Sequence, residues 1–79
     1  MTNATNLEAE RMYIVVVRNL NGSDGVYPPY MYLLYVRDNG WNKALLGAEK
    51  DVNTFVIQRH KLTITFKTTQ YARMWIYQI

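Results

Sequence analysis

The distribution of apolar and polar residues along the chain predicts strands in its first half. Residues 12–18 and 30–37 are β-branched, aromatic or otherwise apolar at nearly every position, which is typical of strands. Both segments are apolar at odd and at even positions, so each strand would carry apolar side chains on both faces of a sheet. We therefore expect these strands to lie inside a sheet rather than at its edge.

Two hairpins are predicted from turn signals. Asn39-Gly40 follows the second strand, and an Asn-Gly pair favours a two-residue turn that needs positive φ twice. A return strand over residues 41–46 is expected, with a short helix there as the alternative because alanine and leucine favour helices. A polar tip at residues 58–61 then separates apolar residues 54–57 from the alternating segment 62–66.

The spacing of apolar residues changes after Lys67, from every second residue to helical spacing. The apolar residues of the last segment recur at helical spacing, at Ala72, Trp75, Ile76 and Ile79. This spacing predicts an amphipathic helix over residues 68–79 that folds back on the preceding hairpin.

Together these elements predict an α+β fold, an antiparallel sheet of four to five strands with one C-terminal amphipathic helix packed on one face. The chain forms a single domain, residues 1–79, in which residues 1–10 are a loose leader or a short helical turn capped by Thr5 and Glu8. One helix covers only one face of a sheet. The second apolar face therefore needs a second copy or another partner, and we expect a homodimer.

Composition narrows the possible functions. The chain is 49% hydrophobic and 14% aromatic, which is too apolar for a disordered segment. It has no cysteine and a single histidine, His60, which is too few ligands for a zinc site. His60 also lacks a nearby carboxylate and nucleophile in the sequence. We therefore expect no metal, no cofactor and no enzymatic activity.

Location is predicted from the apolar runs and the N-terminus. The longest apolar runs fall well short of the about 18 residues that a membrane-spanning helix needs. The first residues have neither a basic start nor an apolar stretch, so no signal peptide is expected. The sequence predicts a cytoplasmic protein without a membrane partner.

Charge is distributed unevenly along the chain, whose net charge is +3. All six acidic residues precede Asn53. The basic residues beyond it form the candidate nucleic-acid set: Arg59, His60, Lys61, Lys67 and Arg73. A basic segment favours a polyanionic partner, and the alternative is a solvated surface with no partner.

The outer face of the expected helix is a second candidate site. It would carry four residues opposite the apolar stripe, Gln70, Arg73, Met74 and Tyr77. Arginine, methionine and tyrosine are enriched at protein interfaces, whereas a solvated helix face is rich in lysine and glutamate. We interpret these four as protein-binding residues, with scattered surface apolar groups as the alternative.

The C-terminal pattern Phe66-x-Thr68-x-x-x-Ala72-x-x-Trp75 resembles the ends of short accessory proteins encoded by bacteriophages, over about twenty residues. The resemblance implies a small sheet with a terminal helix, a role on host machinery and a place in the host cytoplasm. The expected function is a small non-enzymatic interaction protein that binds and modulates a macromolecular partner, as a phage inhibitor of a host factor would. The alternative is a nucleic-acid or nucleotide-binding protein that uses the basic C-terminal third.

Overall fold

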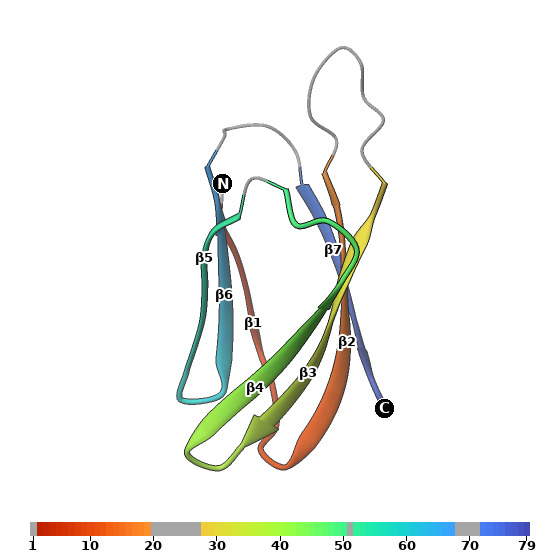
Figure 1. The fold of residues 1–79 in the computed structure, drawn as a ribbon. Coiled ribbons are helices and arrows are strands. Elements are labelled where there is room, and N and C mark those ends of the chain that lie inside the picture. Colours follow the sequence, from red (N-terminus) through yellow and green to blue (C-terminus); the bar gives the residue numbers. More distant parts are fainter. Residues whose placement is uncertain (1, 20–27, 51, 68–71) are drawn as a thin grey trace.

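The computed structural model describes residues 2–19, 28–50, 52–67 and 72–79, which form two antiparallel sheets packed face to face (Figure 1). The three-stranded sheet has the order β1 (Thr2–Asn6), β6 (Lys61–Phe66), β5 (Val52–Gln58). The four-stranded sheet has the order β4 (Gly40–Leu46), β3 (Tyr30–Arg37), β2 (Arg11–Asn19), β7 (Ala72–Gln78). The described residues are all β, so the predicted α+β fold is wrong.

The C-terminal helix is the main error of the sequence prediction. Residues 72–78 form the edge strand β7, which pairs antiparallel with β2. The first part of the predicted helix, residues 68–71, lies outside the described residues. The segment that was expected to fold back on the β5–β6 hairpin belongs to the opposite sheet (Figure 1). The terminal helix implied by the resemblance to phage accessory proteins is therefore absent from residues 72–79.

The strand conformation of β7 has a simple physical reason. Ala72, Met74 and Ile76 alternate with residues that are more exposed, so the segment also satisfies the period of two of a strand. Its tryptophan, isoleucine and tyrosine residues have high strand propensity. The unpaired edge of β2 offers backbone partners along its whole length, and pairing with it buries Ala72. The local sequence fits both a helix and a strand, and pairing with β2 selects the strand.

The N-terminal segment is a strand rather than a loose leader or a helical turn. β1 pairs antiparallel with β6, from Thr2 opposite Thr65 to Asn6 opposite Lys61. The backbone N–H of Leu7 then donates to the carbonyl of His60, at 2.8 Å, and the side chain of Leu7 packs against the core. The segment carries polar residues on both faces, with Asn3 and Thr5 opposite the buried Ile64 and Leu62, and this lack of an apolar alternation concealed the strand in the sequence.

Both predicted hairpins are present, but the first has a different turn. β3 and β4 are joined by Asp38 and Asn39, neither of which has positive φ, and Gly40 already pairs with Arg37. The expected return strand over residues 41–46 is confirmed, and the alternative of a short helix there is wrong. Two successive positive φ angles occur instead in the β5–β6 turn, where Arg59 has φ 50° and His60 has φ 63°. Single positive φ angles occur at Glu10, with φ 60°, and at Gly47, with φ 98°.

The core lies between the two sheets. Every second residue of β2 and β3 is buried, and β6 contributes the facing residues Leu62, Ile64 and Phe66. Aromatic rings connect the sheets at the β4–β5 side, where the ring of Phe55 lies 4.7 Å from that of Tyr32, centroid to centroid. The ammonium group of Lys43 lies 4.2 Å from the Phe55 ring centroid and covers this contact. The buried residues of the described strands are Tyr13, Val15, Val17, Tyr30, Tyr32, Leu34, Val36, Leu62, Ile64, Phe66 and Ala72.

The β5–β6 turn provides a test of backbone strain. Arg59 and His60 both adopt left-handed backbone conformations, which glycine adopts freely and which asparagine, aspartate and histidine tolerate better than arginine. Arg59→Asn is therefore expected to raise the free energy of unfolding by about 0.5–1 kcal/mol, measured by urea denaturation. Arg37→Asn is the matched control, because Arg37 is an exposed arginine without positive φ and should gain nothing. Equal effects of the two substitutions would contradict this explanation.

Candidate functional site

The outer face of the four-stranded sheet carries apolar side chains in consecutive cross-strand rows. In one row Val16 lies between Met31 and Trp75, and in the next Ile14 lies between Leu33 and Tyr77. These positions point away from the core because they alternate with buried residues of the same strands. We call this surface the apolar face, and it consists of Met12, Ile14, Val16, Met31, Leu33, Tyr35, Ala44, Leu46, Trp75 and Tyr77.

The apolar face is exposed in the isolated chain. Leu33 retains 37% of its accessible surface, Trp75 38% and Tyr77 56%. Four strands spaced about 4.8 Å apart and three rows spaced about 6.8 Å apart cover roughly 400 Å² of sheet. None of the ten side chains is charged. A patch of this size is comparable with the largest apolar patch of a typical monomer, and such patches are often functional.

The two ends of the apolar face carry opposite charges. At one end Arg18 and Arg73 lie directly opposite each other on β2 and β7, and both are exposed. At the other end the carboxylate of Glu10 lies beside Tyr35 and the β3–β4 turn, together with Arg37 and Asp38. Arg18 and Arg73 together contribute a charge of +2 to the first end, and the three residues at the second end contribute a charge of −1.

Glu10 is held in place by two hydrogen bonds. The Tyr35 hydroxyl donates to one carboxylate oxygen at 2.6 Å, and the backbone N–H of Asp38 donates to the other at 3.0 Å. The hydrogen bond from Tyr35, followed by that from Asp38, lowers the pKa of Glu10 below its ordinary value. The same bond raises the pKa of Tyr35. Glu10 is therefore a fixed, ionised carboxylate that can accept further donors.

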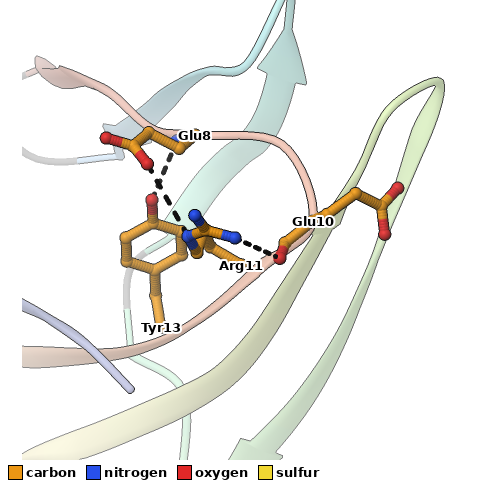
Figure 2. Close-up of polar contacts among 4 residues, drawn as sticks. All are labelled: Glu8, Glu10, Arg11 and Tyr13. Atoms are coloured by element: carbon orange, nitrogen blue, oxygen red, sulfur yellow. Dashed lines mark hydrogen bonds and ion pairs between the residues drawn. The ribbon is translucent and has the colours of Figure 1, made fainter.

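The β1–β2 connection positions Glu10, as Figure 2 shows. The buried ring of Tyr13 reaches this connection, and its hydroxyl accepts a hydrogen bond from the backbone N–H of Glu8 at 2.8 Å. The Arg11 side chain lies against Glu8, with 3.7 Å between Nε and a carboxylate oxygen, and donates to the Glu10 carbonyl at 3.2 Å. The Glu10 side chain points away from these groups, toward the β3–β4 hairpin (Figure 2).

The four residues predicted to bind a protein partner are not all brought together. Arg73 and Tyr77 lie on the outer side of β7, where Tyr77 belongs to the apolar face and Arg73 borders it. Met74 is half-buried and packs toward the core, because adjacent residues of a strand point to opposite faces. Gln70 lies outside the described residues.

The basic residues proposed for nucleic acid are distributed over different surfaces. Arg59 and Lys61 line a concave part of the outer face of the three-stranded sheet, together with Thr54, Gln58, Thr63, Asn6 and Val56. The ring Nε2 of His60 lies 3.1 Å from the carbonyl oxygen of Asp38 and joins two turns. Lys67 follows the far end of β6, and Arg73 lies on the other sheet. The sheets therefore separate this set instead of forming one basic track.

Sequence reasoning missed the central residues of the apolar face. It assigned Trp75 to the core, and it gave Ile14 and Leu33 no functional role. The available signal was the apolar character of both faces of residues 12–18 and 30–37, which did predict an uncovered second face. Assigning β7 to the same surface required knowledge of the pairing between β2 and β7.

Neither a metal-binding group nor a membrane-spanning helix occurs among the described residues. In this part of the chain no three His, Cys, Asp or Glu side chains gather in a group that could hold a metal ion. The same residues contain no helix long and apolar enough to cross a membrane. The apolar face and the concave surface beside Arg59 are the two surfaces on which the candidate functions rest.

Comparison with known proteins adds no relative to this picture. No protein-family model matches the chain, and neither a curated protein nor a solved structure matches it.

Proposed function

We propose that this chain is a non-enzymatic interaction protein that binds another protein through the apolar face. The observation that carries the proposal is the set of ten uncharged side chains arranged in register across four strands. Aromatic residues and methionine, which are enriched at protein interfaces, make up half of this set. Covering them with a partner removes apolar surface from water, which is the main driving force of association.

The partner has a defined chemistry. Its contact surface is apolar in the centre, to match Ile14, Leu33 and Trp75, and it carries an acidic group opposite Arg18 and Arg73. The side chains of the apolar face offer no strong acid or base. Modulation of the partner therefore comes from occupying its surface rather than from a reaction.

Nucleic-acid binding is the second candidate, and the concave surface of the three-stranded sheet is the observation that favours it. Arg59 and Lys61 line this surface, its other lining residues are uncharged, and neither cation has a salt bridge within the described chain. Two phosphate contacts give only weak binding that falls with salt, with a slope of about −1.4 for a single strand. The lining residues include no aromatic side chain on which a base could stack. Protein binding is therefore the first choice.

Photo-crosslinking in cells that produce the chain separates the two candidates. A photoreactive benzophenone amino acid replaces Leu33 in the apolar face or, as the matched control, Val56 on the outer face of the three-stranded sheet. The two positions have similar exposure, 37% and 41%, so they differ mainly in the surface to which they belong. We expect protein adducts of discrete mass from position 33 and few from position 56.

The adducts decide between the candidates. Discrete protein adducts from position 33, reduced by Trp75→Arg in the same chain, support the proposed function. Nuclease-sensitive adducts from position 56, without protein adducts from position 33, would promote the nucleic-acid candidate. Protein adducts that are equally frequent at both positions would contradict a role for the apolar face.

A further inference from the structure

We propose that the partner bound by the apolar face is a second copy of this chain, packed face to face about a twofold axis that runs across the strands. This inference rests on the proposed function and adds both the identity of the partner and its orientation. In this arrangement equivalent strands of the two copies run antiparallel. The Arg18 end of one copy then lies over the Glu10 end of the other. The result is a four-layered assembly with the two four-stranded sheets at its centre.

The available area suits a reversible dimer. From the level of Arg18 to the level of Glu10 the sheet is about 30 Å long, and its four strands are about 19 Å wide. Two copies therefore cover roughly 1,100 Å² together, just above the about 1,000 Å² that a specific interface needs. The apolar residues lie in the middle of this area and the charged residues at its ends, as in known interfaces with a dry centre and a polar rim. Interfaces at this low end of the size range are typical of transient complexes, and we expect self-association at micromolar concentration.

When the strands of the two copies are aligned, as in most sheets that pack face to face, twofold symmetry leaves two ways to stack the same face on itself. An axis that runs along the strands brings identical ends together, so that the two copies of Arg18 and Arg73 gather four guanidinium groups at one end. An axis that runs across the strands brings opposite ends together and keeps β2 over β2 of the second copy. Like charges at an interface are costly, and opposite charges are favourable. The charges therefore select the axis across the strands.

Glu10 is suited to receive the second copy's arginine. Its carboxylate is fixed by Tyr35 and Asp38, so little side-chain entropy is lost on pairing. Two hydrogen bonds leave further acceptor positions on its two oxygens. Arg37 lies at the same end but on β3. Arg18 of the second copy lies over β2, so the two arginines are separated by one strand. The Arg18–Glu10 contact occurs twice in the symmetric dimer.

Sedimentation velocity over about 1–200 µM protein tests the dimer. The unmodified chain is expected to form a dimer, and Leu33→Arg is expected to weaken it at least about 100-fold, because the charge enters the apolar centre twice. Val56→Arg, at a similarly exposed position of the other sheet, should leave the dimer unchanged. Urea denaturation of each variant at low concentration verifies that it folds. A monomer at all concentrations, or a dimer that Val56→Arg weakens and Leu33→Arg does not, would overturn the proposal.

A charge exchange tests the orientation. Arg18→Glu and Glu10→Arg should each weaken the dimer about tenfold, because each places like charges opposite each other twice. A one-to-one mixture of the two variants should restore association, since every contact in the mixed dimer again joins opposite charges. If the axis ran along the strands, Arg18→Glu alone would strengthen the dimer, because its carboxylate would lie near the second copy's Arg73. That result would overturn the orientation, and a mixture that associates no better than either variant alone would contradict the Arg18–Glu10 contact.

The outcome also separates this inference from the proposed function. If the chain is monomeric but position 33 still crosslinks to another protein, the second copy is wrong and the protein-binding role stands. If position 33 crosslinks to nothing and the chain is monomeric, both are wrong. A crosslinked species of twice the chain's mass, formed from position 33, supports both.

Discussion

Replacing Ile64 by alanine is expected to lower the free energy of unfolding by about 2–5 kcal/mol. Ile64 is fully buried in β6, the middle strand of the three-stranded sheet, between Asn3 on β1 and Phe55 on β5. Deleting its side-chain carbons leaves a cavity where the two sheets meet. A domain of this length usually has only about 3–5 kcal/mol of stability. The loss is comparable with the whole stability, so the variant should unfold at a much lower urea concentration and be partly unfolded without urea when the loss is largest.

The control for Ile64→Ala is Val56→Ala, an apolar truncation on the exposed side of the same sheet. It should cost less than about 1 kcal/mol, since surface substitutions have small effects. Urea denaturation followed by circular dichroism measures both variants. If both truncations had the same small effect, the packing of the two sheets around Ile64 would be contradicted.

A charged side chain at position 76 should unfold the protein, whereas the same change at position 75 should be tolerated. Ile76 packs against the core from the inner side of β7, so Ile76→Asp places a carboxylate among apolar groups and should cost about 3 kcal/mol or more. Trp75 points outward and is 38% exposed, so Trp75→Asp keeps its carboxylate in water. Thermal melts at low protein concentration compare the two variants without any contribution from self-association.

This pair of substitutions distinguishes a strand from a helix at the C-terminus. In a helix, positions 75 and 76 belong to one apolar stripe, and a charge at either would be harmful. In a strand, adjacent positions lie on opposite faces, and only the inward one is sensitive. Equal damage by the two substitutions would restore the helical interpretation of residues 72–79.

The strands that could be predicted are those whose local pattern permits one answer. Residues 12–18 and 30–37 are too rich in β-branched and aromatic residues for a helix, and they form the two inner strands β2 and β3. The alternation in residues 62–66 likewise predicts β6 and its buried face. Apolar residues on both faces of the inner strands also predicted that one sheet face would remain uncovered. In these segments propensity, period and burial agree, so no distant contact is needed to choose the conformation.

The segments that could not be predicted either fit both a helical and a strand pattern or show hardly any pattern of apolar residues. Residues 72–79 fit periods of both two and 3.6, and the free edge of β2 selects the strand by supplying partners for its backbone. Residues 2–6 have only a weak pattern, and they become β1 because β6 lies next to them in space. The turn at Asp38 and Asn39 differs from the expected Asn-Gly turn because the register of β3 with β4 places Gly40 inside the strand.

The sequence by itself determined the chemistry of the candidate site, and the tertiary structure decided where that chemistry lies. The amino acids of β2 and β3 required an apolar surface on each side of their sheet, since adjacent side chains of a strand point to opposite faces. Only the pairing of β7 with β2 joins Trp75 and Tyr77 to Ile14 and Leu33 in one continuous face. The charges at the two ends of that face also come from segments far apart in the chain. Contacts between distant segments depend on backbone pairing and burial across the whole fold, which no local pattern of residues specifies.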